Sequence, residues 1–245
     1  MIQNFRIIGL NKMKCVILAG GKGTRIAELS KNIPKPMIKI LGKPIIFRIM
    51  KHYSKFGVTE FIIAGGYKKK IIENYFQKKK IKNWKVTVVG TGLNSMTGGR
   101  LKRLEKYLKD QTFFMTYGDG LSDVNIKKLY KFHLKHKKIA SVTAVHPPVR
   151  FGELEIKEDD VIKFEEKPQA SAGWVNGGYF VLNSNVFDYI DNDQTLFEKE
   201  PMTNLCKNNN LKAFKHENFW KCMDTIRDKI DLEKILSTQG PIWKK

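Results

Sequence analysis

The chain has 245 residues, of which 42% are hydrophobic, 11% aromatic and 28% charged. This length suffices to bury the core of one large domain or two small ones, and the aromatic content excludes a disordered chain. Lys and Arg number 45 against 24 Asp and Glu, which gives a net charge of +21. Only 7 of these 45 cations are Arg, whereas surfaces that read phosphates usually favour the guanidinium group. The composition therefore favours a solvated Lys-rich surface over one that binds nucleic acid or acidic lipid.

The sequence also bears on the compartment. It has no run of about 18 apolar residues, so we expect no membrane-spanning helix. Residues 1–12 lack the basic start, long apolar run and small-residue cleavage site of a secretory signal. The three cysteines are odd in number and have no metal-ligand spacing. We expect a cytoplasmic protein with reduced thiols.

Strands and helices alternate along the first 150 residues. The apolar patterns predict strands at Cys15–Leu18, Phe61–Ala64, Val86–Val89, Phe113–Tyr117 and Ala140–Val145. They predict helices at Ile45–Phe56, Lys69–Gln77, Leu101–Leu108 and Asn125–Lys135. Alternation of this kind is typical of an α/β fold, in which helices cover a mostly parallel sheet.

After Pro147 and Pro148 the pattern changes to short strands that favour a more antiparallel arrangement. Strands are predicted at Glu153–Ile156, Val161–Glu165, Gly178–Leu182 and Leu211–Lys215, with helices near Asn185–Ile190 and Thr225–Leu236. No repeat or Ser/Gly-rich linker divides the chain. We therefore expect one domain over residues 13–245, with halves at about 13–150 and 151–245. Residues 1–12 would be an N-terminal extension without a role in the core, since Lys14 leads straight into a buried strand.

The most informative local feature is a glycine-rich loop after the first strand, Leu18-Ala19-Gly20-Gly21-Lys22-Gly23-Thr24-Arg25. Glycines allow backbone N–H groups to approach a phosphate chain closely. The loop is not a Walker motif, and Ile26 replaces the third glycine of the dinucleotide fingerprint. A tight strand-to-helix turn would also account for the glycines. However, Arg25 and the stiff segment Pro34-Lys35-Pro36-Met37 bring two cations to the loop, which favours phosphoryl or nucleotidyl transfer.

These two segments resemble the signature of the sugar-1-phosphate nucleotidylyltransferases. Later segments resemble the glucose-1-phosphate cytidylyltransferases within that family, and the likeness runs from about Lys14 to Trp243. These segments include Ser95-Met96-Thr97-Gly98-Gly99-Arg100-Leu101-Lys102-Arg103, Thr116-Tyr117-Gly118-Asp119-Gly120, Arg150-Phe151-Gly152, Glu166-Lys167-Pro168, Asn176-Gly177-Gly178, Phe219-Trp220 and Met223-Asp224-Thr225.

The resemblance implies a Rossmann-like mixed sheet of the nucleotide-diphospho-sugar transferase type. It implies the Mg²⁺-dependent reaction of CTP with glucose 1-phosphate to give CDP-glucose and pyrophosphate. Arg25 and Lys35 match the residues that hold the leaving pyrophosphate and the α-phosphate, and Asp119 and Asp224 match two magnesium ligands. Carboxylates at strand ends suit such a site. Taken alone, Asp119 would read as an Asp-Gly turn and Asp224 as a helix N-cap.

The resemblance also assigns the two substrates to different halves of the chain. Besides the glycine loop, the nucleotide would contact Ser95, Gly98, Arg100 and Gly118, with the pair Gly98-Gly99 letting the backbone approach the pyrimidine. The sugar phosphate would contact Glu166, Lys167, Asn176 and Gly177 in the second half. Without the resemblance, Gly98–Arg103 reads as a basic helix start and Glu166-Lys167 as an exposed turn. Trp220 would read as a core residue or as a stacking surface for sugar or base.

Departures from the family pattern keep alternatives open. Ile33 stands where Lys is usual, Lys22 stands where a neutral residue is usual, and the chain is short between Gln77 and Val86. In the second half, Lys221-Cys222 stands where Gln-Pro is common, and Gln169-Ala170-Ser171-Ala172 replaces a Gly/Asp-rich turn. One alternative is the same chemistry with dTTP or UTP, or with another phosphorylated acceptor.

A more remote alternative, suggested by the charge of +21, is a non-catalytic regulatory or nucleic-acid-binding protein. Against it stands the complete set of Arg25, Lys35, Asp119 and Asp224, which such a protein would not need. We expect an enzyme of nucleotide-sugar supply for polysaccharide biosynthesis that works as a homo-oligomer, with neither nucleic acid nor membrane as partner.

Overall fold

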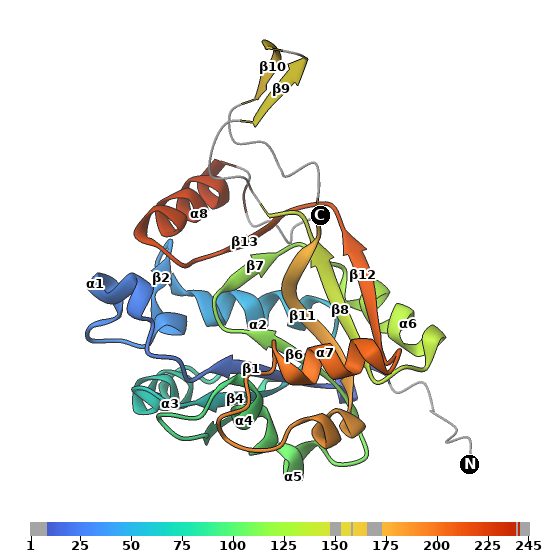
Figure 1. Cartoon of the computed structure of the whole chain (residues 1–245). Helices are drawn as coiled ribbons and strands as arrows, with labels where there is room; N and C mark the ends of the chain where they lie inside the picture. Colours follow the sequence, from blue (N-terminus) through green and yellow to red (C-terminus); the bar gives the residue numbers. More distant parts are fainter. Residues whose placement is uncertain (1–8, 148–152, 158, 166–172, 239, 241–245) are drawn as a thin grey trace.

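The computed structural model describes residues 9–147, 153–157, 159–165, 173–238 and 240. A seven-stranded sheet forms the centre of the molecule, and helices cover both of its faces (Figure 1). In spatial order, its strands are β12 (Leu211–His216), β8 (Ala140–Val145), β11 (Val175–Asn183), β6 (Thr112–Tyr117), β1 (Lys14–Ala19), β4 (Glu60–Gly65) and β5 (Lys85–Gly90).

The sheet is mixed, as the sequence predicts. Strands β6, β1, β4 and β5 run parallel to one another, and β12 runs parallel to β8. Strand β11 lies between β6 and β8 and is antiparallel to both. The first half of the chain is therefore a parallel α/β unit, and the antiparallel pairing enters with β11.

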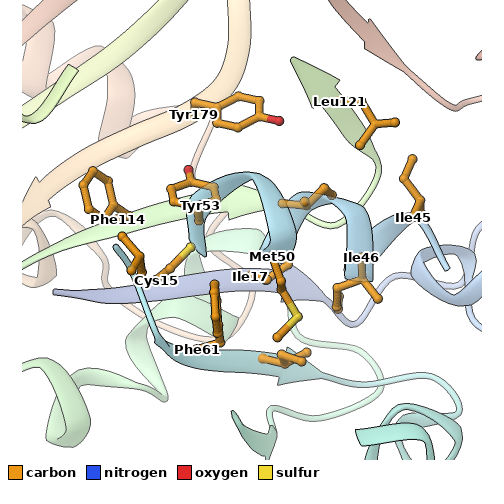
Figure 2. Packing of buried hydrophobic residues seen from close by; sticks show 14 of the residues in the cluster. Cys15, Ile17, Ile45, Ile46, Met50, Tyr53, Phe61, Phe114, Leu121 and Tyr179 are labelled. Carbon is orange, nitrogen blue, oxygen red and sulfur yellow. The ribbon is translucent and has the colours of Figure 1, made fainter. Parts of the chain in front are cut away.

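Side chains that alternate along β1 reach two separate cores. Cys15 and Ile17 point to one face, where Tyr53, Phe114 and Tyr179 surround them (Figure 2). The helices that cover this face are α2 (Ile45–Lys55), α3 (Lys69–Lys78), α6 (Ile126–His136) and α8 (Ile226–Thr238). The core under α2 is aromatic as well as aliphatic, since the rings of Tyr53 and Tyr179 stack with centroids 5.9 Å apart.

Val16 and Leu18 point to the opposite face and its own core. This face is covered by α4 (Thr97–Lys102), α5 (Glu105–Leu108), the 3₁₀ helix η4 (Ser184–Tyr189) and α7 (Glu200–Lys207). The sequence predicts one helix over Leu101–Leu108, and this prediction is wrong. The chain turns tightly, with the Leu104 N–H bonding to the Leu101 carbonyl at 2.9 Å. The turn brings Leu101, Leu104 and Leu108 into the same core.

Smaller elements frame the edges of the sheet. They are η1 (Leu10–Lys12), η2 (Thr24–Ile26), α1 (Ala27–Ser30), η3 (Lys35–Met37) and the antiparallel pairs β2 (Lys39–Ile40) with β3 (Lys43–Pro44), β7 (Gly120–Ser122) with β13 (Trp220–Cys222), and β9 (Glu153–Lys157) with β10 (Asp160–Glu165). The β9–β10 hairpin projects away from the rest of the molecule (Figure 1). None of the helices in the described ranges is long and apolar enough to span a bilayer.

The segment before the first strand contributes two side chains to the core. Met13 is a buried member of the core cluster, and Leu10 is partly buried against that cluster. The Asn11 carbonyl accepts a long hydrogen bond of 3.5 Å from the Thr59 hydroxyl. The expectation that residues 1–12 have no role in the core is therefore wrong for Leu10.

Candidate active site

A cavity of about 930 Å³ opens where the first strand ends. The glycine loop and Lys35 line one side of it, and residues 93–97 with Gln194, Leu196 and Glu198 line another. Gly118 and Asp119, which follow β6, and Asp224, which follows β13, also line it. Ligands of open α/β sheets bind beyond the carboxyl ends of the strands, and this cavity lies in that position.

The glycine loop is shaped by two of its glycines in different ways. Gly23 has a positive φ of 67°, a conformation that other residues rarely adopt. At Gly20 a Cβ atom would lie only 2.1 Å from Arg100 Nη1, so the backbone passes directly over a guanidinium group. Gly21 has no heavy atom within 4 Å of its would-be Cβ. The middle of the loop at Gly21 is therefore open to the cavity, whereas Gly20 packs against the Arg100 side chain.

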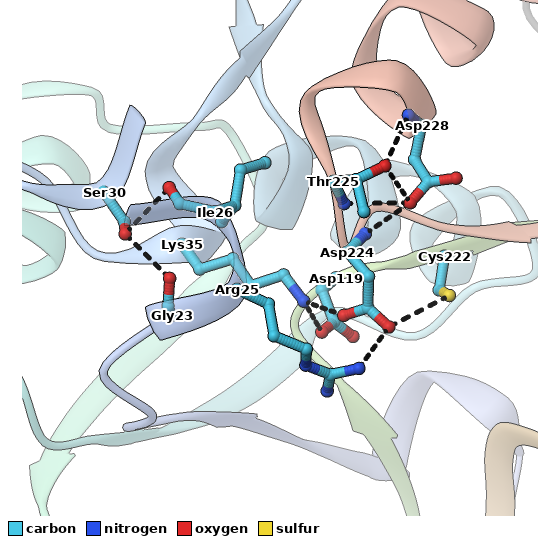
Figure 3. A network of polar contacts seen from close by, with 10 residues as sticks. All are labelled: Gly23, Arg25, Ile26, Ser30, Lys35, Asp119, Cys222, Asp224, Thr225 and Asp228. Carbon is cyan, nitrogen blue, oxygen red and sulfur yellow. Dashed lines mark hydrogen bonds and ion pairs between the residues drawn. The ribbon is translucent and has the colours of Figure 1, made fainter. Parts of the chain in front are cut away.

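Lys35 joins the two predicted metal ligands. Its ammonium Nζ lies 2.6 Å from Asp119 Oδ2 and 2.6 Å from Asp224 Oδ1 (Figure 3). Pro34 is extended and Pro36 stands within the following 3₁₀ turn, so the backbone around Lys35 is stiff. Lys35 itself is only 9% exposed. One nearly buried cation thus pairs with two carboxylates from distant parts of the chain.

A small pair of strands explains how the two carboxylates meet. Asp119 occupies the turn between β6 and β7, and Asp224 follows β13. Strands β7 and β13 pair antiparallel, with Cys222 opposite Gly120. In addition, the Met223 N–H donates to the Asp119 carbonyl at 2.9 Å. The pairing of β7 with β13 therefore holds the Asp119 and Asp224 side chains at the same end of the sheet.

Charge pairing dominates the electrostatics of this cluster. Burial disfavours the charged form of Lys35, but Asp119 and Asp224 outweigh it, so the pKa of Lys35 is raised. Burial alone would raise the pKa of Asp224, but hydrogen bonding and attraction from Lys35, with a contribution from Arg25, lower it. Both groups of the Lys35–Asp224 pair are thus held in their charged forms at neutral pH.

Asp224 is not the cap of the last helix. The Thr225 hydroxyl accepts the Asp228 N–H at 3.1 Å, and Asp228 Oδ2 accepts the Thr225 N–H at 2.9 Å. This reciprocal pair is a capping box, so the end of α8 is satisfied without the Asp224 carboxylate. The carboxylate instead accepts hydrogen bonds from Lys35 and from Arg25 Nη1, the latter at 2.8 Å. The capping alternative that the local sequence suggests is therefore wrong.

The donor set suits a hard divalent cation. The Lys35 ammonium is a positive charge already bound between the two carboxylates. In the described part of the chain, no group of three or more His, Cys, Asp or Glu residues is arranged to hold a metal. Mg²⁺ is commonly bound by one or two carboxylates together with substrate phosphates and water, rather than by an all-protein cage. Two convergent aspartates beside a phosphate-type loop fit that pattern.

The predicted nucleotide contacts divide into two groups. Ser95, Arg100 and Gly118 line the cavity together with the glycine loop. Arg100 also holds the segment after β5 in place, because its Nη1 donates to Thr91 Oγ1 at 3.0 Å and to the Gly92 carbonyl at 2.6 Å. The second group is the pair Gly98–Gly99, which does not line the cavity, although the sequence predicts contact with the nucleotide there.

The glycine pair allows close packing against residues 193–195. A Cβ atom at Gly99 would lie 2.3 Å from the Asp193 carbonyl oxygen, and the Gly98 N–H donates to the Thr195 carbonyl at 2.9 Å. The expectation that this pair admits a pyrimidine is corrected accordingly. The glycines allow the start of α4 to pack against residues 193–195, of which Gln194 lines the cavity.

A family model described as nucleotidyl transferase matches residues 14–237 of this chain. The chain belongs to the nucleotidyl transferase family. It is therefore a nucleotidyltransferase enzyme, and enzymes of this family generally use a divalent metal. The matched range includes the glycine loop and both aspartates described above.

Individual relatives agree with this family membership. The glucose-1-phosphate cytidylyltransferase of Salmonella typhimurium (strain LT2) is 46% identical over 254 residues, covering 95% of this chain and 99% of that protein. The D-glycero-alpha-D-manno-heptose 1-phosphate guanylyltransferase of Campylobacter jejuni is 35% identical, covering 76% and 81%. The crystal structure of HddC from Yersinia pseudotuberculosis complexed with GMP-PN is 29% identical and superposes with a TM-score of 0.72, covering 91% and 98%.

The predicted sugar-phosphate residues of this nucleotidyltransferase are only partly described. Glu166 and Lys167 lie outside the described residues. Asn176 lines the cavity, and its side-chain oxygen accepts the Gly178 N–H at 2.8 Å. The Gly177 carbonyl accepts the indole N–H of Trp220 at 2.7 Å. Trp220 also lines the cavity and so ties the Asn176 loop to β13.

Sequence reasoning missed one polar cluster of the cavity. The Glu198 side chain accepts hydrogen bonds from the hydroxyl groups of Tyr117 and Thr97. All three residues line the cavity. Thr97 and Tyr117 do lie inside motifs that resemble the family, but Glu198 lies just before an unpredicted helix and has no local signature. Only the folded chain brings it to the site.

Proposed function

We propose that this nucleotidyltransferase transfers the cytidylyl group of CTP to glucose 1-phosphate, giving CDP-glucose and pyrophosphate. The observation that carries the proposal is the junction of Lys35 with Asp119 and Asp224 beside an open glycine loop. Two carboxylates and a buried cation at the end of a phosphate-type loop suit attack on a nucleotide phosphate. The choice of base and sugar rests on the 46% identity to the Salmonella typhimurium enzyme.

The binding of CTP would begin at the glycine loop. Gly21 leaves room for a phosphate chain against the backbone, and Gly23 supplies the left-handed turn that shapes the loop. Arg25, whose side chain is 75% exposed, is free enough to turn from Asp224 toward the leaving pyrophosphate. Ser95 and Gly118 line the same cavity as the loop. The nucleotide would thus lie between the loop and residues 93–97.

The acceptor would enter from the side of β11. Asn176, with Glu166 and Lys167, would contact the sugar phosphate, and the Trp220–Gly177 hydrogen bond would keep that loop beside the cavity. An oxygen of the sugar phosphate attacks the α-phosphorus of CTP. As this O–P bond forms, the bond from the α-phosphorus to the oxygen bridging to the β-phosphate breaks, and pyrophosphate leaves. No proton transfer to the attacking phosphate oxygen is needed.

Asp119 and Asp224 would hold Mg²⁺, and Lys35 would then pair with the α-phosphate. When bound, the metal ion neutralises the phosphate oxygens and orients the reacting groups. The protein supplies the rest by positioning: its cations hold the phosphates in line, and the cavity walls limit the motion of both substrates. Because this chemistry draws on nucleoside triphosphates, we also propose the cytoplasm as the site of action.

The test is a substrate panel. Pyrophosphate release is measured with CTP, dTTP, UTP, ATP and GTP, each with and without glucose 1-phosphate. We expect release only with both substrates and at least tenfold faster with CTP than with any other triphosphate. Turnover with another triphosphate but not with CTP would show that the base assignment is wrong. The guanylyl-type relatives make GTP the most informative competitor.

A further inference from the structure

Glu198 presents a fixed carboxylate to the cavity. It lies in the segment just before α7 and is an exposed residue that lines the cavity. Its Oε1 accepts the hydroxyl of Tyr117, and its Oε2 accepts the hydroxyl of Thr97. No Lys or Arg within the described ranges forms an ion pair with it. A carboxylate so held retains lone pairs for a ligand.

Both supporting hydroxyls are fixed as donors toward Glu198. The Thr97 hydroxyl accepts the Phe197 N–H at 2.9 Å, so its own hydrogen is available for Glu198 Oε2. Tyr117 is partly buried; burial, and after it the charge of Glu198, raises the pKa of Tyr117, so the phenol stays protonated. The orientation of the carboxylate is therefore set by α4 and β6 and does not depend on a ligand.

The chemistry of this group selects its ligand. An ionised carboxylate only accepts hydrogen bonds, and it repels phosphate. It therefore suits a neutral part of a substrate that carries several hydroxyl groups. The neighbouring residues indicate which substrate: Tyr117 ends β6 two residues before Asp119, and its ring packs so closely on the β11 loop that a Cβ atom at Gly178 would lie 2.6 Å from it. Glu198 is thus held between the wall of residues 93–97, through Thr97, and the end of β6 beside the β11 loop, through Tyr117.

We propose that Glu198 accepts hydrogen bonds from the hydroxyl groups of the acceptor sugar and so determines which sugar phosphates are used. Tyr117 and Thr97 are positioning residues that hold its carboxylate in place. This inference rests on the proposed function, because it assumes that a sugar 1-phosphate occupies the β11 side. It assigns a specificity role to a residue that has no sequence motif.

The main test is a double-mutant cycle between the enzyme and the sugar. kcat/KM is measured at saturating CTP for the wild-type enzyme and Glu198→Gln, with glucose 1-phosphate and its 2-, 3-, 4- and 6-deoxy analogues. A site built to bond a hydroxyl rejects an analogue that lacks it. We expect the wild-type enzyme to lose roughly 10- to 100-fold on at least one analogue, as a lost hydrogen bond to a charged group predicts. Glu198→Gln should lose a similar factor on glucose 1-phosphate but little more on that analogue.

Matched variants separate recognition from general damage. Glu200→Gln removes a carboxylate two residues away that does not line the cavity, and it should leave all values within twofold. Thr97→Val should weaken the coupling and raise KM for the sugar phosphate, and Thr97→Ser should restore it. The KM for CTP should change less than threefold in every variant.

Several outcomes would overturn the inference. If the losses from Glu198→Gln and from each deoxy analogue simply multiply, Glu198 does not contact those hydroxyls. If KM for CTP rises while KM for the sugar phosphate does not, Glu198 faces the nucleotide instead. If the wild-type enzyme shows no turnover with CTP and glucose 1-phosphate, the proposed function itself is wrong, and this inference is wrong with it.

Discussion

The Lys35 ammonium lies 2.6 Å from the Asp224 carboxylate and at the same distance from Asp119. In this arrangement a side-chain cation occupies the space between the two carboxylates proposed to bind metal. A metal ion and this ammonium compete for the same oxygens. Substrate phosphate would relieve the competition, because it offers Lys35 a new partner when the metal takes the aspartates.

Replacing Lys35 by Met should therefore separate metal binding from turnover. Without the ammonium, the two carboxylates repel each other and should bind Mn²⁺ or Mg²⁺ roughly tenfold more tightly in the absence of nucleotide. Turnover should fall roughly a hundredfold, because a charge that stabilises the transition state is lost. Calorimetry and Mn²⁺ electron spin resonance measure the first effect. Lys22→Met, a lysine of the same cavity, is the control, and equal metal affinity in all three proteins would contradict the competition.

Asp224→Asn should lower turnover, whereas Thr225→Ala should lower the stability of the fold. Asp224→Asn keeps the size of the side chain but removes its charge, and we expect turnover to fall roughly a hundredfold or more. CTP affinity should change much less, since the glycine loop remains. Thr225→Ala breaks the capping box and should cost about 1 kcal/mol of stability while leaving turnover nearly unchanged.

The two changes are compared by urea unfolding and steady-state kinetics of the same preparations. If Asp224→Asn retains nearly normal turnover, the metal assignment is wrong.

Two adjacent glycines offer a matched pair of substitutions. Gly20→Ala would place a methyl group 2.1 Å from Arg100 Nη1, and that guanidinium is bonded to Thr91 and Gly92 and cannot easily move. We expect a loss of about 1–3 kcal/mol in stability, as overpacking typically costs. Gly21→Ala meets no atom within 4 Å, so stability should stay within about 0.5 kcal/mol. Its CTP affinity should nevertheless fall, because the methyl group faces the phosphate chain.

Urea unfolding measures the stability of both variants, and fluorescence titration measures their nucleotide affinity. Equal stability of the two variants would show that Gly20 is not packed against Arg100.

Buried histidines should make the fold sensitive to acid. Burial lowers the pKa of His133 to about 3 and that of His52 to about 4, against 6.5 for a free histidine. Below pH 6.5 the unfolded chain therefore binds protons that the folded chain does not, and stability falls as the pH falls. Each histidine contributes a slope of about 1.4 kcal/mol per pH unit between its two pKa values.

The variant His133→Asn tests this slope, since Asn can preserve the hydrogen bond that His133 Nδ1 makes with Ser141 at 2.9 Å. Between pH 6.5 and pH 5 it should lose about 2 kcal/mol less than the wild-type protein. Urea unfolding at the two pH values measures the difference, and parallel losses would contradict it.

Local sequence was sufficient where one segment determines its own structure. The apolar runs predict the strands of the central sheet, and the Gly and Pro segments predict the loop and the stiff Lys35 turn. The sequence did not reveal β7 and β13, which are three residues each, because their pairing depends on chain segments far apart. That pairing brings Asp119 to Asp224.

The same limit explains the errors at α4. Gly98 and Gly99 read as a flexible approach to a ligand, but their bare backbone packs against residues 193–195. Glu198 was missed for the converse reason, since its hydroxyl partners come from α4 and β6. Residues whose role depends on a distant partner carry no local signal.

The most direct test of the central claim follows the phosphorus atoms themselves. Phosphorus NMR of the enzyme with CTP, glucose 1-phosphate and Mg²⁺ should show CDP-glucose and pyrophosphate appearing in equal amounts. Neither product should form without glucose 1-phosphate, and Asp224→Asn should slow both equally. Formation of CDP with inorganic phosphate, or of CMP without a nucleotide sugar, would contradict cytidylyl transfer at this site.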